Sequence, residues 1–284
     1  MKNGLLNIAV ELKKTGVFKS VNNIIDMGTK TLRIHYDELE YLFNQANIKF
    51  NSNKFKFLKN FPKGKRKSTK LFWEELGIKN YNCLDINKEK DSIYCDLNVP
   101  FNDKKHIGKY DLVTDFGNNE HVFNVGEAYK TMYKLCKKNG FIWIFQQVYN
   151  GNGFFHFDIS FFEGFSLANK LNTIYAAYIV LIDDYEQFLI PANKNLLDVI
   201  DLNKVKSIDI TYVFRKTSNQ EFKYYYQYNM KNKKNFYSIK FIQNKFPPER
   251  YYIQTKPIKD IKHKANKGDS FSEEWIRATG IKKK

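Results

Sequence analysis

The chain has 284 residues, of which 43% are hydrophobic and 17% aromatic. This much apolar material can bury a sizeable core, which excludes an intrinsically disordered chain. The three cysteines form no CxxC pair, which argues against a disulfide framework and against a thiolate zinc site. The most apolar run, residues 173–182, is far shorter than the roughly 20 residues that span a bilayer. Residues 1–16 contain no apolar signal core, so we expect a soluble, cytoplasmic protein without a membrane span.

The formal net charge of +17 has two interpretations. A positive charge of this size attracts nucleic acid, an anionic membrane surface or acidic substrates. Nearly all the basic residues are lysines, however, and arginine, which binds phosphate in a bidentate manner, stands at only five positions. The chain is also rich in Asn, Ile, Tyr and Phe, a joint bias that an AT-rich coding sequence imposes on surface positions. We therefore favour compositional bias and keep nucleic acid as an alternative partner.

Apolar residues spaced three and four apart predict helices in the first part of the chain. The first is an amphipathic helix over 5–17, and the second covers 36–45. A short apolar strand over 23–28 lies between them and ends in a tight turn. Residues 47–70 are basic and irregular and predict a loop, after which Ser68 begins a short helix closed by Gly77.

Strands follow in quick succession, at 81–86, 92–97, 110–116 and 141–147. A helix over 125–136, which Asn139-Gly140 ends, separates the last two strands. Strand, helix and strand in this order indicate a parallel crossover, so the sequence predicts an α/β fold. Further along the chain we expect a helix and two more strands, at 160–170, 173–182 and 208–215.

The predicted elements divide the chain into a central domain and two extensions. We expect an N-terminal helical extension over 1–22, a central domain over 23–217 and a basic, aromatic C-terminal extension over 218–284. Within the central domain, about 47–70 forms an insertion, and about 183–206 forms a helical insertion or lid. The tyrosines at 224–228 lie beside lysines and suit base stacking, but a half-buried strand is the stronger interpretation.

The segment 110–122, YDLVTDFGNNEHV, followed by LCKKNG at 135–140, resembles the class I S-adenosylmethionine-dependent methyltransferases. In that family the fourth strand commonly reads FDLV, leads into EHV and precedes a helix and a glycine-containing turn. The resemblance covers about 24–216. It implies a three-layer, Rossmann-like α/β fold, with a mostly parallel sheet and an antiparallel late strand at 208–215. It also implies S-adenosyl-L-methionine as the cofactor.

Two predicted strand ends match the part of the family pattern that holds the methionine and ribose of the cofactor. Asp26 and Gly28 match the first motif, which lies beside the methionine part. Asp85 matches the acid that accepts from the ribose hydroxyls, a role that suits a carboxylate. The first motif has one glycine where many members have two or three, so the turn must accommodate Thr29 and Lys30. The alternatives are an ordinary strand exit at Asp26 and Gly28 and a turn that begins at Asp85.

Two further strand ends match the adenine and sulfonium sides of the family's site. Asp96 and Leu97 match the motif beside the adenine, and Thr114 and Asp115 match the end of the fourth strand, near the sulfonium and the methyl acceptor. The alternatives are a turn at Asp96 and a cap for the following segment at Asp115.

Two histidines are candidate catalytic residues. Transfer of a methyl group needs a general base only when the acceptor is an unactivated hydroxyl or a similar group. His121, next to Glu120, and His156, in an aromatic loop after the fifth strand, are the candidates. The alternatives are that Glu120 and His121 orient the next helix and that the loop around His156 packs for stability. A related metal-dependent pattern has a glutamate where Gly117 stands here, so we expect no metal.

The resemblance therefore predicts an S-adenosylmethionine-dependent methyltransferase acting on an O or N acceptor, with a small molecule or sugar favoured as the acceptor. Two alternatives remain. One is a basic nucleic-acid-binding module, and the other is a non-catalytic scaffold on a methyltransferase-like fold. The motif GxGxxG is absent after the first strand, which argues against a dinucleotide-dependent enzyme.

Overall fold

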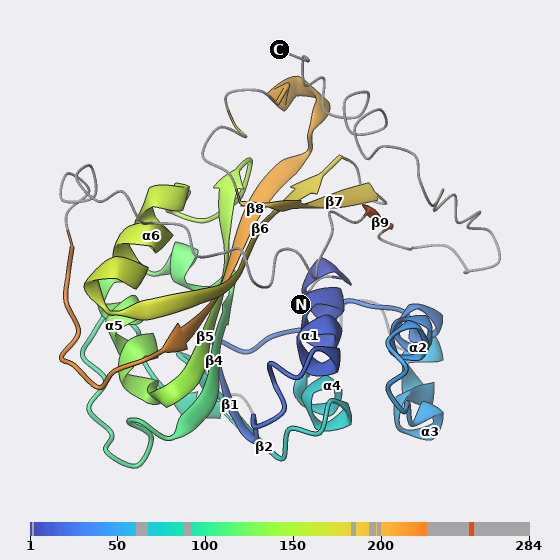
Figure 1. The fold of residues 1–284 in the computed structure, drawn as a ribbon, viewed down its shortest axis with the longest axis horizontal. Coiled ribbons are helices and arrows are strands. Elements are labelled where there is room, and N and C mark those ends of the chain that lie inside the picture. Colours follow the sequence, from blue (N-terminus) through green and yellow to red (C-terminus); the bar gives the residue numbers. More distant parts are fainter. Residues whose placement is uncertain are drawn as a thin grey trace.

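A nine-stranded sheet with the order β3-β2-β1-β4-β5-β8-β6-β7-β9 forms the centre of the molecule (Figure 1). The computed structural model describes residues 1, 3–60, 68–87, 92–182, 186–192, 197, 200–225 and 250–252. The strands are β1 (Asn23–Met27), β2 (Asn80–Asp85), β3 (Ser92–Tyr94), β4 (Tyr110–Phe116), β5 (Cys136–Tyr149), β6 (Leu171–Leu181), β7 (Glu186–Pro191), β8 (Ser207–Lys216) and β9 (Arg250–Tyr252). Strands β3, β2, β1, β4 and β5 pair in parallel, and β8 lies antiparallel between β5 and β6. This arrangement confirms the predicted mostly parallel sheet with an antiparallel late strand.

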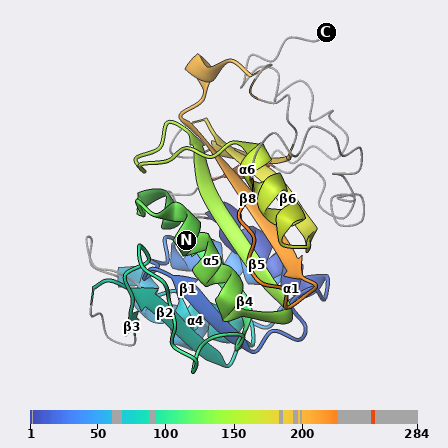
Figure 2. The ribbon, with the colours of Figure 1, turned by 90° about the vertical axis from the view of Figure 1, so that its left-hand side faces the viewer.

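Helices cover both faces of the sheet, which confirms the predicted three-layer α/β fold (Figures 1 and 2). One face carries α1 (Asn3–Lys14), α2 (Tyr36–Gln45), α3 (Ser52–Phe55), the 3-10 helix η1 (Lys56–Asn60) and α4 (Lys70–Glu75). The other face carries α5 (Val125–Leu135) and α6 (Ile159–Ala168). None of the described helices is long and apolar enough to cross a bilayer.

The strands are apolar on both faces because each face packs against helices. Successive side chains in a strand point to opposite faces, so neighbours in the sequence enter different cores. In β1, Ile24 packs with the α1 side and Ile25 with the α5 side. Trp143 of β5 packs on the α1 side, and its neighbour Ile144 packs on the α5 side. The buried Trp143 indole also donates a hydrogen bond to Thr211 of β8 at 2.8 Å, which links the parallel half of the sheet to the antiparallel strand.

The prediction of a helical segment over 183–206 was wrong for 186–191. Strand β7 lies there, paired antiparallel with β6, and the 3-10 helix η3 (Leu202–Lys204) follows it. The side chains of Phe188, Leu189 and Ile190 are all buried. A short run that is apolar on consecutive positions suits a strand covered on both sides, whereas a surface helix needs apolar residues three and four apart. Residues 183–185, 193–196, 198 and 199 of the predicted lid lie outside the described residues.

Helix α5 ends differently from the prediction. Asn139-Gly140 does not close the helix, because α5 stops at Leu135 and β5 begins at once with Cys136. Asn139 takes a left-handed conformation (φ 65°) inside β5, beside a register shift in the β4–β5 pairing. The ammonium group of Lys216 ends the helix instead, since it donates to the carbonyl oxygens of Tyr133 and Cys136 at 2.8 Å each.

The predicted loop at 47–70 is partly helical. It contains α3 and η1, whose residues Phe55 and Leu58 are buried, while 61–67 lie outside the described residues. The third predicted strand is also shorter than expected, because β3 ends at Tyr94. β3 starts beside Cys83, before the end of β2.

The beginning of the predicted C-terminal extension packs on α5 and α6. The hydroxyl of Tyr133 donates to the carbonyl oxygen of Gln220 at 3.1 Å, and the hydroxyl of Tyr225 donates to that of Phe161 at 2.7 Å. No strand forms at Tyr224 or Tyr225, so the predicted half-buried strand is wrong for these two residues. The rest of that prediction, over 226–228, lies outside the described residues, as do 229–249 and 253–284.

Candidate functional site

The candidate site lies where β1, β2 and β4 end at the same edge of the sheet. Strand β1 is at the centre, with β2 on one side and β4 on the other, so the order of winding reverses at β1. Open α/β sheets bind ligands at such a point, outside the carboxyl ends of the strands. Asp26, Asp85 and Asp115 stand at or next to the ends of these three strands.

Asp26 is fully buried and is held by three hydroxyl groups. Thr114 of β4 donates to one carboxylate oxygen. Thr69 and Tyr81 donate to the other, at 3.0 and 2.9 Å. Burial raises the pKa of Asp26, although the three hydroxyl groups and the charge of Lys30 act in the opposite direction. Asp26 and Thr114, both predicted to bind cofactor, thus bond to each other and tie β1 to β4.

Gly28 is the point where the chain leaves β1, and its left-handed backbone (φ 75°) favours glycine. Its N–H donates to the carbonyl oxygen of Leu84 at 2.7 Å, so the turn stays close to β2. A Cβ at this position would lie 2.2 Å from Oδ1 of Asn118. The close approach that the single glycine permits is therefore made, in this structure, by the chain's own Asn118 side chain.

Asp85 stays partly exposed at the end of β2. One carboxylate oxygen accepts from the N–H of Thr29 at 2.8 Å, and the other accepts from the N–H of Asn87 at 2.8 Å. Partial burial opposes ionisation, but these hydrogen bonds hold the pKa of Asp85 below its ordinary value. The side-chain amide of Asn87 also donates to the second oxygen, at 3.1 Å, so both lone pairs of that oxygen are used. The oxygen bonded to Thr29 can accept from one hydroxyl donor, and a second hydroxyl donor would have to replace the Asn87 amide. The alternative interpretation, that a turn begins at Asp85, is confirmed, because Asp85 accepts from the N–H of Asn87.

Lys30 follows the turn and is buried, with 7% of its surface exposed. Burial lowers the pKa of its ammonium group, and four carboxyl groups act in the opposite direction: Asp115, Asp26, Glu120 and Asp85. Within the described part of the chain, its Nζ has no hydrogen-bond or ion-pair partner. Its charge therefore lies among the ends of β1, β2 and β4 without being paired to any one of them.

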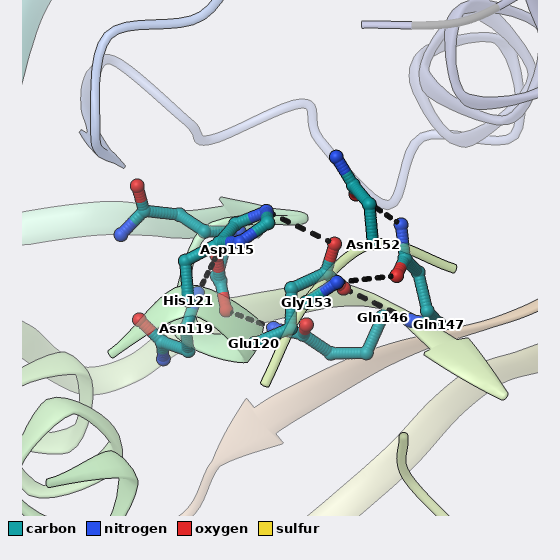
Figure 3. A network of polar contacts seen from close by, with 9 residues as sticks. Asp115, Asn119, Glu120, His121, Gln146, Gln147, Asn152 and Gly153 are labelled. Atoms are coloured by element: carbon teal, nitrogen blue, oxygen red, sulfur yellow. Dashed lines mark hydrogen bonds and ion pairs between the residues drawn. The ribbon is translucent and has the colours of Figure 1, made fainter. Parts of the chain in front are cut away.

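Asp115 lies under the turn that follows β4, and its side chain is fully buried. One oxygen accepts from the N–H groups of Asn118 and Asn119, at 3.0 and 3.3 Å. Asp115 therefore caps the segment that follows it, which was the alternative predicted from the sequence. The other accepts from the side-chain amide of Gln146. Burial raises the pKa of Asp115 to about 6, against the opposing charge of Lys30. Figure 3 shows this network together with the neighbouring residues of β5 and its loop.

Glu120 and His121 lie on the 3-10 helix η2 (Asn119–His121) beside this network (Figure 3). The Glu120 carboxylate accepts from the N–H of Gln147 at 3.0 Å, and its other oxygen is 3.6 Å from Nε2 of His121. Burial raises the pKa of Glu120 to about 7. Partial burial and the charge of Lys30 lower the pKa of His121, so its imidazole is neutral over a wider pH range than that of a free histidine. A neutral imidazole beside a partly ionised carboxylate can accept a proton.

The loop after β5 is tied to η2. The N–H groups of Phe154 and Phe155 donate to the carbonyl oxygen of Glu120 at 2.8 and 3.2 Å. A Cβ at Gly153 would lie 2.8 Å from Cβ and Cγ of Glu120, so the backbone of the loop touches the Glu120 side chain. The loop therefore covers one side of Glu120.

The remaining predicted residues lie away from these contacts. Asp96 accepts from the N–H of Asn98 at 2.9 Å and forms a turn, as its alternative reading expected. Leu97 is buried in the core on the α5 side. His156 is exposed, and no hydrogen bond or ion pair joins it to other described residues. Among the described residues, no group of three or more His, Cys, Asp or Glu side chains is placed to hold a metal ion.

Three residues of the site were not singled out from the sequence as functional. Lys30 was noted only as a residue that the turn must accommodate, while Asn118 and Gln146 carried no signal at all. Lys30 stands two positions after Gly28, where further glycines of the first motif are common, so the missing glycine was the available signal for it.

Comparison with known proteins gave similarity in three dimensions only. No family model and no curated protein sequence matches the chain. The 1,6-didemethyltoxoflavin-N1-methyltransferase of Burkholderia thailandensis is 10% identical, with a TM-score of 0.38 over 75% of this chain and 80% of that one. A TehB-like SAM-dependent methyltransferase of Corynebacterium glutamicum is 14% identical, with a TM-score of 0.34 over 73% and 87%. A phosphoethanolamine N-methyltransferase of Haemonchus contortus is 11% identical, with a TM-score of 0.37 over 75% of this chain and 52% of that one.

These identities and TM-scores are low, so the strand order of the chain itself is the basis for its fold class. The parallel run β3-β2-β1-β4-β5, followed by the antiparallel β8, gives the Rossmann-like fold that the resemblance to class I methyltransferases implies.

Proposed function

We propose that this protein binds S-adenosyl-L-methionine at the ends of β1, β2 and β4 and transfers its methyl group to an O or N atom of a small-molecule acceptor. The observation that carries the proposal is that Asp26, Asp85 and Asp115 stand at or next to the ends of three neighbouring parallel strands. The left-handed Gly28 begins the turn there, at the point where the sheet reverses its winding. The cofactor is a cation with a ribose diol, and a group of carboxylates suits both features.

The residues present fit the nucleoside end of the cofactor better than its methionine end. At the nucleoside end, Asp85 is ionised and partly exposed and would accept from the ribose hydroxyls. Ile86, which follows it, is exposed and would supply an apolar contact for the base. At the methionine end, the Asn118 side chain fills the space beside Gly28 and would have to move. When bound, the cofactor would supply an activated methyl group.

His121 would serve as the general base for a hydroxyl acceptor. Because the pKa of His121 is lowered, its imidazole is mainly neutral at neutral pH. Glu120, 3.6 Å away, would stabilise the imidazolium after it takes the proton from the acceptor. His156 is exposed and would act only if its loop brought it to the acceptor.

The surface beside His121 favours an acceptor with an apolar face. Phe123 and Phe154 are 82% and 72% exposed, and the backbone of Phe154 is bonded to Glu120. Large exposed aromatic side chains next to a polar group suit a ligand that is apolar on one side and carries a reactive oxygen or nitrogen. Small heterocycles and sugars both have this property.

The second candidate is a non-catalytic scaffold on the same fold. The observation that favours it is the buried ammonium group of Lys30 among the strand ends, where a cationic cofactor would have to lie. A scaffold of this kind would bind neither cofactor nor its product, which separates it from the first candidate.

Calorimetric titration with S-adenosylhomocysteine and S-adenosylmethionine tests the proposal. We expect micromolar binding by the wild type and at least tenfold weaker binding by Asp85→Asn, which removes a charge-assisted acceptor. Asp103→Asn is the matched control. Asp103 also accepts from a backbone N–H two residues later, at 2.9 Å, but it precedes β4 at the opposite edge of the sheet. Absence of binding in the wild type, or equal loss in both variants, would refute the proposal.

A further inference from the structure

We propose that the ammonium group of Lys30 is a built-in cation of the cofactor site, which competes with the sulfonium charge of S-adenosylmethionine and gives the site a preference for the uncharged thioether product. This inference rests on the proposed function, because it concerns the same site. It assigns to Lys30 a role in selecting between two ligands that differ by one methyl group and one positive charge.

The position of Lys30 is the first step. It lies two residues after Gly28, in the turn that connects β1 to the helices on the α1 face. The N–H of Thr29, next to Lys30, donates to Asp85 of β2 at 2.8 Å, and Asp26 of β1 pairs with Thr114 of β4, which precedes Asp115. Lys30 therefore lies at the ends of three neighbouring strands, and its charge acts on all three carboxyl groups. A ligand bound at these strand ends would meet it.

The isolation of the ammonium group is the second step. A buried lysine normally donates to carbonyl or carboxylate oxygens, and Lys216 of the same protein donates to two carbonyl oxygens. Only 7% of the surface of Lys30 is exposed, and it has no such partner within the described part of the chain. The surrounding charge holds it there, so no specific hydrogen bond has to break for it to move.

The charge balance is the third step. Up to four carboxylates surround Lys30, and the imidazole of His121 lies close enough for Lys30 to lower its pKa. A cationic ligand among these carboxylates gains the same attraction that now stabilises Lys30. The two cations repel each other, so binding of the sulfonium requires Lys30 to swing out or lose its proton. The neutral sulfur of S-adenosylhomocysteine makes no such demand.

The asparagine beside Gly28 supports this picture. The side chain of Asn118 lies so close to Gly28 that a Cβ there would be 2.2 Å from its Oδ1. Asn118 therefore occupies the space beside Gly28, at the methionine end of the site, while Asp85 at the ribose end stays partly exposed. The ribose end is therefore accessible to a ligand, whereas at the methionine end the Asn118 side chain would have to move before a ligand could bind.

The experiment compares the two ligands in matched variants by calorimetric titration at pH 7.5. The ratio of the dissociation constants of S-adenosylmethionine and S-adenosylhomocysteine is the measured quantity. We expect Lys30→Met, which keeps the length of the side chain and removes its charge, to lower this ratio about tenfold relative to the wild type. Lys30→Arg keeps the charge and should leave the ratio within about threefold. Lys109→Met is the control, since Lys109 is exposed just before β4 at the opposite edge.

Other outcomes overturn the inference in distinguishable ways. An unchanged ratio in Lys30→Met, with both ligands still bound, refutes the competition and leaves the proposed function intact. Weaker binding of both ligands by Lys30→Met would mean that Lys30 binds the carboxylate they share, and this also refutes it. Absence of binding by every variant refutes the proposed function and this inference together.

A measurement on the wild type covers the case in which Lys30→Met does not fold. Lysine side chains react with acetic anhydride when they are accessible, and mass spectrometry of peptides gives the extent for each lysine. We expect saturating S-adenosylmethionine to increase the acetylation of Lys30 at least threefold over saturating S-adenosylhomocysteine, with Lys109 unchanged. Equal acetylation of Lys30 with both ligands contradicts the inference.

Discussion

The backbone of Gly153 lies directly against the side chain of Glu120, so that a Cβ on Gly153 would be 2.8 Å from both Cβ and Cγ of Glu120. This contact joins the loop after β5 to the 3-10 helix η2 that follows β4. Two N–H groups of the same loop, from Phe154 and Phe155, donate to the Glu120 carbonyl oxygen. The loop and Glu120 therefore hold each other in place, and the position of the candidate base depends on a glycine.

Gly153→Ala should displace this loop. The added methyl group has no space beside Glu120, so we expect a loss of about 1–3 kcal/mol in the free energy of unfolding, measured with urea by tryptophan fluorescence. Gly126→Ala is the control, because a Cβ there would meet only the Tyr224 ring at 3.4 Å, in the first turn of α5. Alanine favours a helix more than glycine does, so the control should be neutral or stabilising. Equal stability of the two variants would contradict the packing described here.

Thr114→Val should destabilise the protein more at pH 8 than at pH 4.5. The hydroxyl of Thr114 donates to Asp26 and favours its ionised form, so its removal penalises the carboxylate and spares the carboxylic acid. We expect a loss of about 1–3 kcal/mol at pH 8 and a smaller loss at pH 4.5, measured by urea unfolding at both values.

Thr131→Val is the control for this experiment. Thr131 is also fully buried, but its hydroxyl has no hydrogen-bond partner among the residues that the structure describes. Replacing an unsatisfied hydroxyl by a methyl group of the same shape should be neutral or stabilising. If both threonine variants lost the same stability at pH 8, the hydrogen bond to Asp26 would contribute nothing.

The sequence predicted the ends of β1 and β4 because local signals suffice there. Ile24 and Ile25 form a short apolar run that ends at Asp26 and Gly28, and the run in β4 likewise ends at an acid and a glycine. Parallel strands bring such ends to one edge, so the meeting of Asp26 with Thr114 followed from the order of elements.

The surroundings of Lys30 could not be predicted in the same way. Its four carboxyl neighbours come from three strands and a 3-10 helix, and their distances from Lys30 depend on how the turn after Gly28 folds. No local pattern encodes that path. The strand β7 was missed for a different reason, since three consecutive apolar residues fit a buried strand and a buried helix equally well until the partner β6 is known.

Lys216→Met should release the end of α5. The ammonium group of Lys216 donates to two carbonyl oxygens at 2.8 Å and lies 3.9 Å from the centre of the Tyr133 ring. Loss of these contacts leaves buried carbonyl groups without donors, so we expect a loss of about 2–3 kcal/mol in the free energy of unfolding. The control is Lys14→Met at the end of α1, whose exposed ion pair with Glu11 should contribute at most about 1 kcal/mol. A loss in Lys216→Met no larger than in the control would show that water replaces the ammonium group.

The last prediction concerns the pH dependence of stability at Glu120. Burial raises the pKa of this group in the folded protein to about 7, from an ordinary value of 4.5. Between these two values the unfolded chain has already lost the proton that the folded protein still holds. The contribution of Glu120 to stability is therefore complete below about pH 4.5 and is lost as the pH rises through about 7.

Glu120→Gln removes this pH dependence, because an amide cannot ionise and its oxygen can still accept from the N–H of Gln147. We expect the variant to gain about 2 kcal/mol relative to the wild type between pH 4.5 and pH 8, measured as the difference in urea unfolding free energies. Asp115, whose pKa is raised to about 6, titrates in the same range. Because its charge also raises the pKa of Glu120, part of its pH dependence is included in this difference. A difference that stays constant across this range would mean that Glu120 ionises in the folded protein as readily as it does in the unfolded chain.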